Sequence, residues 1–140
     1  MVKPKRAATP QFPDPITTEV VGSSLLAAAE EMGEILVRAS YSANIKERRD
    51  SSSAILDARG GTIAQASHVP LHMGSMLGLG QAIIQRYLES EIRPGDVFIT
   101  NDPYSGGGTH LPDITVAAPF FAWGKLVGFA ANVAHHAEVG

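Results

Sequence analysis

Apolar side chains recur at every third or fourth position over residues 21–39. This spacing is typical of an α-helix with one buried face, because about 3.6 residues complete each helical turn. Asp14 followed by Pro15 predicts the start of the helix, since aspartate caps helices and proline favours the first helical position. We therefore expect a helix from about Ile16 to Tyr41. Its predicted buried residues are Val21, Leu25, Ala28, Met32, Ile35 and Ala39.

The rest of the chain predicts short strands and one further helix. Two β-prone runs flank Gly60–Gly61, which indicates a hairpin. A second periodic segment predicts a helix over residues 75–89, with Met76, Leu79, Ile83 and Tyr87 on one face. Strict strand–helix alternation is absent, so we assign the α+β class, with a long N-terminal helix, β-hairpins and a second helix forming part of a larger mixed domain. The expected strands cover residues 51–57, 62–65, 97–100, 113–121 and 126–134.

Composition excludes several kinds of function. The chain has no cysteine, which rules out disulfides, cysteine zinc sites and thiol catalysis. Its net charge is −3 and its basic residues are scattered, so it lacks the charge pattern of a nucleic-acid-binding protein. No apolar stretch approaches the roughly 18 residues that span a bilayer, and no apolar segment typical of a signal peptide follows the basic start. We expect a cytoplasmic protein that binds neither nucleic acid nor membrane, with residues 1–14 as a flexible N-terminal arm.

A loop expected over residues 101–112 is the most informative segment for function. Its glycines 106–108 either allow a ligand to approach the backbone closely or form a merely flexible turn. No Gly-Lys-Ser/Thr sequence follows them, so we do not expect a nucleotide-binding P-loop. His110 and Asp113 then stand three residues apart at the entry to a strand. This pair suits Mn²⁺, Fe²⁺ or Zn²⁺ binding, although an ordinary surface histidine beside a strand-initiating aspartate has the same pattern.

Two adjacent histidines, His135 and His136, lie near the end of the last predicted strand. Successive side chains of a strand point to opposite faces, so only one of the two can join His110 and Asp113. The other would support the ligands or fill space, and the alternative is that both histidines are simply exposed.

Two further segments carry ionisable groups. Residues 46–50, Lys-Glu-Arg-Arg-Asp, are typical of a solvated helix end, although one member could turn inward. His68 and His72 have the spacing of helical metal ligands, but Pro70 between them argues against a regular helix. We therefore expect these histidines to contact substrate, to support the metal ligands or to be ordinary structural residues.

Five motifs together resemble the N-terminal region of the hydantoinase B/oxoprolinase family. The resemblance runs in order from about Asp14 to the last residue, and it is the combination of motifs that makes it specific. This family includes subunits of N-methylhydantoinase, 5-oxoprolinase and acetone- or acetophenone-type carboxylases. The motifs are residues 43–50 (ANIKERRD), 72–76 (HMGSM), 94–104 (PGDVFITNDPY), 108–115 (GTHLPDIT) and 134–140 (AHHAEVG).

The resemblance implies a divalent metal site for Mn, Zn or Fe. It places no catalytic side chain beyond the ligands themselves. The implied ligands are Asp50, His110, Asp113 and His135. The residues expected to contact substrate or to support the ligands are Glu47, His72, Asn101, Asp102, Gly107, Gly108 and His136.

The resemblance also implies a division of labour between chains. A hydantoinase A-type subunit or domain would bind ATP and Mg and phosphorylate the carbonyl oxygen of a cyclic amide, so that water on the metal held by this chain can attack the phosphorylated lactam or imide. The alternative within the family is the metal-binding subunit of an acetone- or acetophenone-type carboxylase. Substrates under consideration are therefore 5-oxoproline, a hydantoin and a ketone.

Members of the family are several times longer than this chain. We therefore expect residues 15–140 to be the N-terminal portion of a hydantoinase B-like domain, truncated at its C-terminal end and part of a hetero-oligomer. The isolated chain is expected to be inactive, and a non-catalytic fragment that at most binds metal or a partner chain is the remaining alternative.

Overall fold

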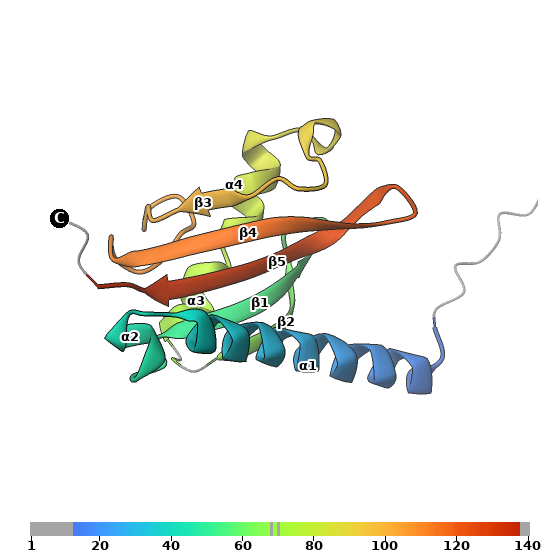
Figure 1. Cartoon of the computed structure of the whole chain (residues 1–140). Coiled ribbons are helices and arrows are strands. Elements are labelled where there is room, and N and C mark those ends of the chain that lie inside the picture. The colour runs from blue at the N-terminus through green and yellow to red at the C-terminus, as the bar shows by residue number, and fades with distance from the viewer. Residues whose placement is uncertain (1–12, 68, 70, 138–140) are drawn as a thin grey trace, which may run out of the picture.

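The computed structural model describes residues 13–67, 69 and 71–137. Its strands are β1 (Ser51–Asp57), β2 (Thr62–Ser67), β3 (Phe98–Thr100), β4 (Asp113–Ala122) and β5 (Lys125–His135). They form one antiparallel sheet in the order β2-β1-β5-β4-β3. A long helix lies along one side of the sheet and shorter helices pack on the other (Figure 1). This arrangement confirms the α+β class. The predicted arm falls mostly on residues 1–12, which lie outside the described residues, as does His68.

Helix α1 (Pro15–Ala39) begins and ends close to the predicted positions. The Asp14 carboxylate accepts hydrogen bonds from the backbone N–H groups of Ile16 and Thr17, each at 3.0 Å, and so caps the helix. After α1, a single turn of helix, α2 (Ala43–Lys46), leads the chain toward β1.

The buried face of α1 differs from the predicted one. The helix presents Ala29, Gly33 and Val37 to the sheet, whereas Val21 and Ile35 are 51% and 58% exposed. Small side chains at Ala29 and Gly33 let the helix backbone approach the sheet closely, so the contact centres there and not on the bulkier stripe. Of the other predicted residues, Leu25 and Met32 are partly buried and Ala28 and Ala39 are exposed. Ala29 belongs to a cluster with Ile55, Ala64 and Ala66 of β1 and β2.

The first hairpin forms where the sequence predicts it. Its turn is fixed by Asp57, whose carboxylate accepts hydrogen bonds from the N–H groups of Arg59 and Gly61 at 2.8 Å each. Gly60 within the turn has a φ of 81°, which glycine adopts without strain.

The helix predicted over residues 75–89 is wrong in its bounds. The structure has α3 (Leu71–Met76), α4 (Leu79–Arg86) and a short 3₁₀ segment, η1 (Glu89–Glu91). The break falls at Leu77–Gly78. A Cβ at Gly78 would lie 3.2 Å from the Cα of Gly106, so the chain here makes room for the loop that precedes β4.

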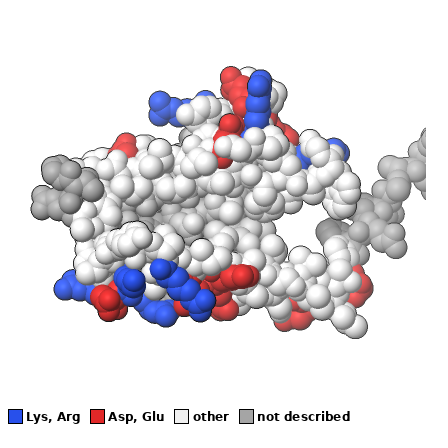
Figure 2. All heavy atoms as spheres, in the orientation of Figure 1, with Lys and Arg blue, Asp and Glu red and all other residues white. Residues whose placement is uncertain are grey.

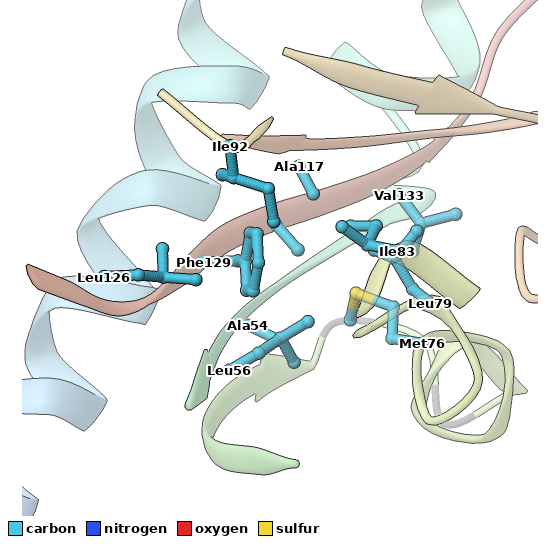
Figure 3. Close-up of a cluster of buried hydrophobic side chains, with 11 residues drawn as sticks. Ala54, Leu56, Met76, Leu79, Ile83, Ile92, Ala117, Leu126, Phe129 and Val133 are labelled. Atoms are coloured by element: carbon cyan, nitrogen blue, oxygen red, sulfur yellow. The ribbon is translucent and has the colours of Figure 1, made fainter. Parts of the chain in front are cut away.

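The main core lies on the side of the sheet opposite α1. Met76, Leu79 and Ile83 are buried there, as predicted from their spacing, whereas Tyr87, predicted on the same face, lies just beyond α4 and is 40% exposed. They meet alternate residues of the central strands, because every second side chain of a strand points to the same face. Figure 3 shows this cluster, whose other buried members are Ala54, Leu56, Ile92, Ala117, Leu126, Phe129, Ala131 and Val133.

The second hairpin, β4–β5, confirms the predicted pair of long strands. Its tip is a tight turn in which Trp123 and Gly124 both have positive φ, and the Trp123 side chain is 99% exposed. Figure 2 shows an uncharged band over β4 and β5 beside α1, and the exposed Lys125 lies at the first position of β5, next to the turn. Within the described part of the chain, no helix combines the length and apolarity needed to cross a membrane.

Candidate metal centre

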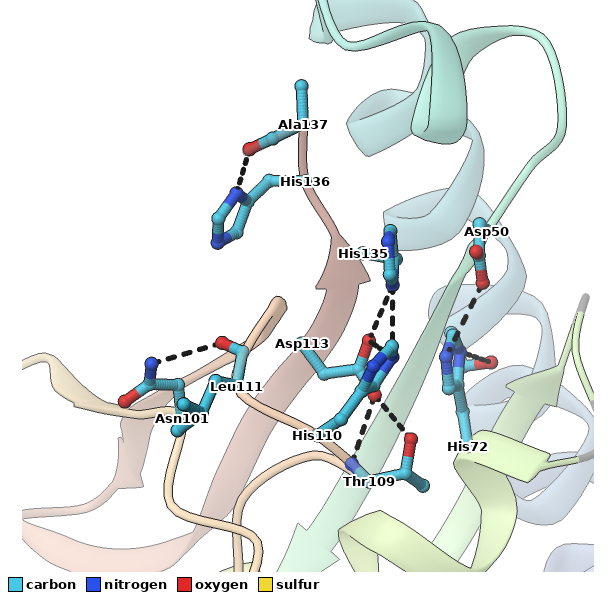
Figure 4. A network of polar contacts seen from close by, with 11 residues as sticks. Asp50, His72, Asn101, Thr109, His110, Leu111, Asp113, His135, His136 and Ala137 are labelled. Carbon is cyan, nitrogen blue, oxygen red and sulfur yellow. Dashed lines mark hydrogen bonds and ion pairs between the residues drawn. The ribbon is translucent and has the colours of Figure 1, made fainter. Parts of the chain in front are cut away.

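Three ionisable side chains, His110, Asp113 and His135, converge at one end of the sheet (Figure 4). Asp113 is the first residue of β4 and pairs directly with His135, the last residue of β5. Directly opposed residues of antiparallel strands project to the same face, so these two side chains lie together. His110 reaches them from the loop, whose last turn is closed by a 2.9 Å hydrogen bond from the Asp113 N–H to the His110 carbonyl.

The three side chains are almost equidistant from one another. Asp113 Oδ1 lies 3.1 Å from His110 Nε2 and 3.2 Å from His135 Nδ1. The two imidazole nitrogens are 3.1 Å apart. The Asp113 side chain is fully buried, whereas those of His110 and His135 are 52% and 23% exposed. The cluster therefore has a buried carboxylate on one side and two histidines open to solvent on the other.

The local environment keeps Asp113 in its ionised form. Burial by itself raises the pKa of this carboxyl group. The hydroxyl and the N–H of Thr109 donate hydrogen bonds to Asp113 Oδ2 at 2.6 and 2.9 Å, and these bonds, with His110 and His135 beside Oδ1, lower the pKa below its ordinary value. One carboxylate oxygen is thus occupied by Thr109, and the other faces the two histidines.

This geometry fits a divalent metal ion. Imidazole and carboxylate ligands bind such ions at about 2.0–2.2 Å, which places neighbouring ligand atoms of one ion about 3.0–3.4 Å apart. The observed separations of 3.1–3.2 Å fall in this range. Two histidines and one carboxylate on one side of an ion leave further positions open to substrate or water. The donor set suits Mn²⁺, Fe²⁺ or Zn²⁺.

The loop glycines serve close packing of the loop within the fold, which differs from a merely flexible turn. A Cβ at Gly107 would overlap the side chain of Thr100, and one at Gly108 would lie 2.6 Å from Asp113 Cβ. Gly106 faces Gly78 at a similarly close approach. Gly106 and Gly108 also have φ of 100° and 68°, which disfavour other residues. The glycines therefore let the loop lie directly on the sheet and carry His110 to Asp113.

Asp50 lies next to this cluster but outside the group of three. Its carbonyl oxygen accepts a 3.0 Å hydrogen bond from the His135 N–H, which joins the start of β1 to the end of β5. Its carboxylate oxygen Oδ1 is 3.5 Å from Nε2 of His72. Glu47, at the end of α2, is exposed.

His136 points away from the cluster, on the other side of β5 (Figure 4). Its Nδ1 contacts the carbonyl oxygen of the neighbouring Ala137. The structure thus brings His135 alone of the two to His110 and Asp113, in line with the alternation of strand side chains.

Asn101 and Asp102 organise the loop and do not reach the cluster. The side-chain amide of Asn101 donates a 3.0 Å hydrogen bond to the carbonyl oxygen of Leu111. The Asp102 carboxylate accepts hydrogen bonds from the N–H of Tyr104, at 2.9 Å, and from the hydroxyl of Ser105. These bonds hold Asp102 ionised, because they lower the pKa of its carboxyl group.

Sequence reasoning missed two residues of this region, Thr109 and Ser52. Thr109 supplies both hydrogen bonds to Asp113 Oδ2, and its place directly before His110 was the available signal. The Ser52 hydroxyl lies 3.3 Å from Nδ1 of His72. Ser52 is the middle of three consecutive serines, and all three are fully buried in β1. Such a run in a central strand indicates polar partners, because buried hydroxyls require them.

Fold and site together define a class: an α+β domain that carries a two-histidine, one-carboxylate cluster of metal-ligand geometry at one end of an antiparallel sheet. The chain belongs to the hydantoinase B/oxoprolinase family, whose model matches residues 14–140.

Individual relatives show the same similarity. The chain is 45% identical over 127 residues to 5-oxoprolinase 1 of Arabidopsis thaliana, a match that covers 91% of this chain and 10% of that protein. The structure is similar to that of the ATP-dependent caprolactamase from Pseudomonas jessenii, with a TM-score of 0.72 and 26% identity over 90% of this chain and 21% of the other. It also shares its fold with acetone carboxylase, with a TM-score of 0.78 and 23% identity over 87% of this chain and 16% of the other. The chain thus spans about a tenth of the length of the matching 5-oxoprolinase.

Proposed function

We propose that this chain supplies the metal site of an ATP-dependent hydrolase that opens cyclic amides of the 5-oxoproline or hydantoin type. The observation that carries the proposal is the set of three ligand atoms, on His110, Asp113 and His135, at mutual separations of 3.1–3.2 Å. Membership of the hydantoinase B/oxoprolinase family and the names of the 5-oxoprolinase and caprolactamase relatives support the choice of substrate class.

In this proposal His110, Asp113 and His135 hold a Mn, Zn or Fe ion, with Asp50 as the fourth ligand. When bound, such an ion supplies Lewis acidity that lowers the pKa of water and polarises an oxygen of the substrate. Asp113 contributes the negative charge that attracts the ion, and Thr109 holds that carboxylate ionised and oriented. The exposed side of His110 is where substrate enters.

Residues around the cluster have supporting parts in the proposal. Asn101 and Asp102 shape the loop, and Gly107 and Gly108 keep it close to the sheet. We propose that Glu47 and His136, which the structure places outside the cluster, meet the substrate or the rest of the assembly.

ATP and Mg are assigned to a hydantoinase A-type subunit or domain. Phosphorylation of the amide carbonyl oxygen there would activate the carbonyl carbon for addition of water. The ring C–N bond would then break to leave an acyl phosphate, from which a second water releases phosphate and the carboxylate. The described residues of this chain contain no phosphate-binding loop, and the caprolactamase relative is named as ATP-dependent. The uncharged band over β4 and β5 is a surface suited to such a partner (Figure 2). We propose that the chain is the N-terminal portion of a larger cytoplasmic hetero-oligomer.

A carboxylase is the second candidate function, and the shared fold with acetone carboxylase favours it. The same metal ligands would serve either reaction. Assay of the full assembly with 5-oxoproline or a hydantoin plus ATP, and with acetone plus bicarbonate and ATP, separates the two functions. The third possibility, a non-catalytic fragment, predicts turnover of none of these compounds.

Metal content is the first test of the proposal. We expect the purified chain to retain near-stoichiometric Mn, Zn or Fe by plasma mass spectrometry, and to lose it in His110→Ala, Asp113→Ala and His135→Ala. His136→Ala is the matched control and should keep its metal, because its side chain points to the other side of the strand. Absence of metal from both this chain and a full-length assembly with its partner would refute the proposed site.

A further inference from the structure

Asp50 is held by contacts of its backbone N–H, its backbone carbonyl and one carboxylate oxygen, although its side chain is 32% exposed. Its backbone N–H donates to the carbonyl of Asn44 at 3.0 Å, and its carbonyl accepts from the His135 N–H at 3.0 Å. Its carboxylate faces His72. Because α2, β5 and α3 all contact Asp50, the fold determines the direction of its side chain.

The residue before Asp50 adds to this constraint. Arg49 has a φ of 54°, a left-handed conformation that costs energy for a residue with a side chain. Its guanidinium group binds the Glu34 carboxylate of α1 through both terminal nitrogens, at 2.5 and 3.3 Å. This ion pair anchors the strained turn from which Asp50 leaves toward the cluster.

His72 is positioned on both sides of its ring. It is 2% exposed, and its Nδ1 lies 3.3 Å from the Ser52 hydroxyl while its Nε2 lies 3.5 Å from Asp50 Oδ1. With the hydroxyl donating to Nδ1, the proton of the neutral ring resides on Nε2 and points at the Asp50 carboxylate. In this arrangement Ser52 favours the form of the ring whose Nε2–H can hold Asp50.

The order Ser52, His72, Asp50 also matches the residue types of a nucleophilic catalytic triad. Ser52 is fully buried in the central strand β1, so its hydroxyl has no access to a substrate. The chain of contacts runs from this buried serine to a position beside the metal cluster. It is therefore suited to orienting a metal ligand and not to nucleophilic attack.

We infer that His72 is a positioning residue for the metal centre: braced by Ser52, it aims the Asp50 carboxylate at the site formed by His110, Asp113 and His135. The inference rests on the proposed function, because Asp50 has a task there only if a metal binds. Residues that orient metal ligands through a hydrogen bond typically change metal affinity by about 10- to 100-fold when removed.

The test is a titration of the chain with Co²⁺ alone, followed by calorimetry and by the visible absorption bands of the ion, which respond to the number and geometry of its ligands. We expect His72→Ala to bind Co²⁺ about 10- to 100-fold more weakly and with an altered spectrum. His72→Gln, which restores an N–H donor, should recover part of the affinity. In the His72→Ala/Asp50→Ala double variant, affinity should be no lower than in Asp50→Ala, because both changes remove the same contribution.

Ser52→Ala and Ser53→Ala form a matched pair that covers the case in which His72→Ala does not fold. Both serines are fully buried on β1, but Ser53 lies on the opposite face and donates to Asn132 at 2.6 Å. Only Ser52→Ala should weaken Co²⁺ binding. Wild-type binding with no change in His72→Ala, or with Ser52→Ala equal to Ser53→Ala, would overturn the inference and leave the metal site standing. No Co²⁺ binding by the wild type, either as this chain or in a full-length assembly with its partner, would instead contradict the proposed function itself.

Discussion

The site depends on glycines, which have no side chain, as much as on the residues proposed to bind the metal. Gly108 has a φ of 68° and lies against the Asp113 side chain, so both its conformation and its lack of a Cβ bring the loop to the carboxylate. Thr109, directly after it, is thereby placed to donate both of its hydrogen bonds to Asp113. The conformation that Gly108 allows thus places Thr109 to keep the Asp113 carboxylate ionised.

Gly108→Ala tests this dependence. A Cβ in this left-handed conformation, 2.6 Å from Asp113 Cβ, should lower the free energy of unfolding by about 1–3 kcal/mol and weaken metal binding. Gly22→Ala is the control. Gly22 lies within α1, and a Cβ added there would meet no neighbouring side chain or strand within 4 Å, so the change should stabilise the helix by about 0.5–1 kcal/mol. Denaturant unfolding of both variants measures the two effects, and equal stabilities would contradict the packing argument.

The two ends of helix α1 are stabilised by different interactions. Its N-terminal half has exposed apolar side chains such as Ile16 and Val20, and it depends on the Asp14 cap. Its C-terminal half is held by the sheet through Ala29 and by the ion pair between Glu34 and Arg49. The first turns should therefore be the part of the helix most sensitive to loss of the cap.

The cap predicts a pH dependence of helix stability. Hydrogen bonds from the hydroxyl and N–H of Thr17 lower the pKa of Asp14 below its ordinary value of 3.8. A group whose pKa is lower in the folded state stabilises that state above its unfolded pKa, and this contribution is lost as the pH falls through the folded pKa. Helicity should hence decrease below about pH 4 more steeply in the wild type than in Asp14→Asn, which keeps a side-chain acceptor without a titrating charge. Circular dichroism between neutral pH and about pH 2 measures the difference, and parallel curves would argue against the cap.

The whole molecule has one well-covered and one partly covered side. The α3 and α4 helices close the main core, whereas α1 covers mainly β1 and β2 on the other side. The remaining strands leave the uncharged band over β4 and β5 there. Ile99 of the edge strand β3, which is 69% exposed and pairs with Val116 of β4, borders this band. Uncharged surfaces of this kind favour association with another chain.

We expect the isolated chain to self-associate through this band and to show no ATP-dependent amidase activity alone. Ile99→Lys should reduce association in light scattering, because a charge on an exposed edge strand opposes pairing. Ile63→Lys, at the opposite edge of the sheet and 51% exposed, is the control and should leave association unchanged. A monomeric wild-type chain, or turnover by the isolated chain, would refute the respective expectation.

Much of the fold was predictable because it is encoded locally. Asp14 and Pro15 mark the start of α1, and β-prone runs around two tight turns indicate both hairpins. The break between α3 and α4 was not predictable, because it makes room for Gly106, which is distant in sequence. The buried face of α1 was missed for a similar reason: apolar spacing identifies a stripe, but the shape of the sheet selects which part of the helix it contacts.

The sequence alone determined the class of fold, the family and the residue types of the site, since motifs and periodicity are local properties of the chain. It also limited the paired histidines to one ligand, because strand side chains alternate. Tertiary structure decided that His135 is the one beside His110 and Asp113, because the register of β4 with β5 pairs it with Asp113. It alone revealed Ser52 and His72 behind Asp50, because contacts between β1 and α3 arise only when the sheet and its helices pack together.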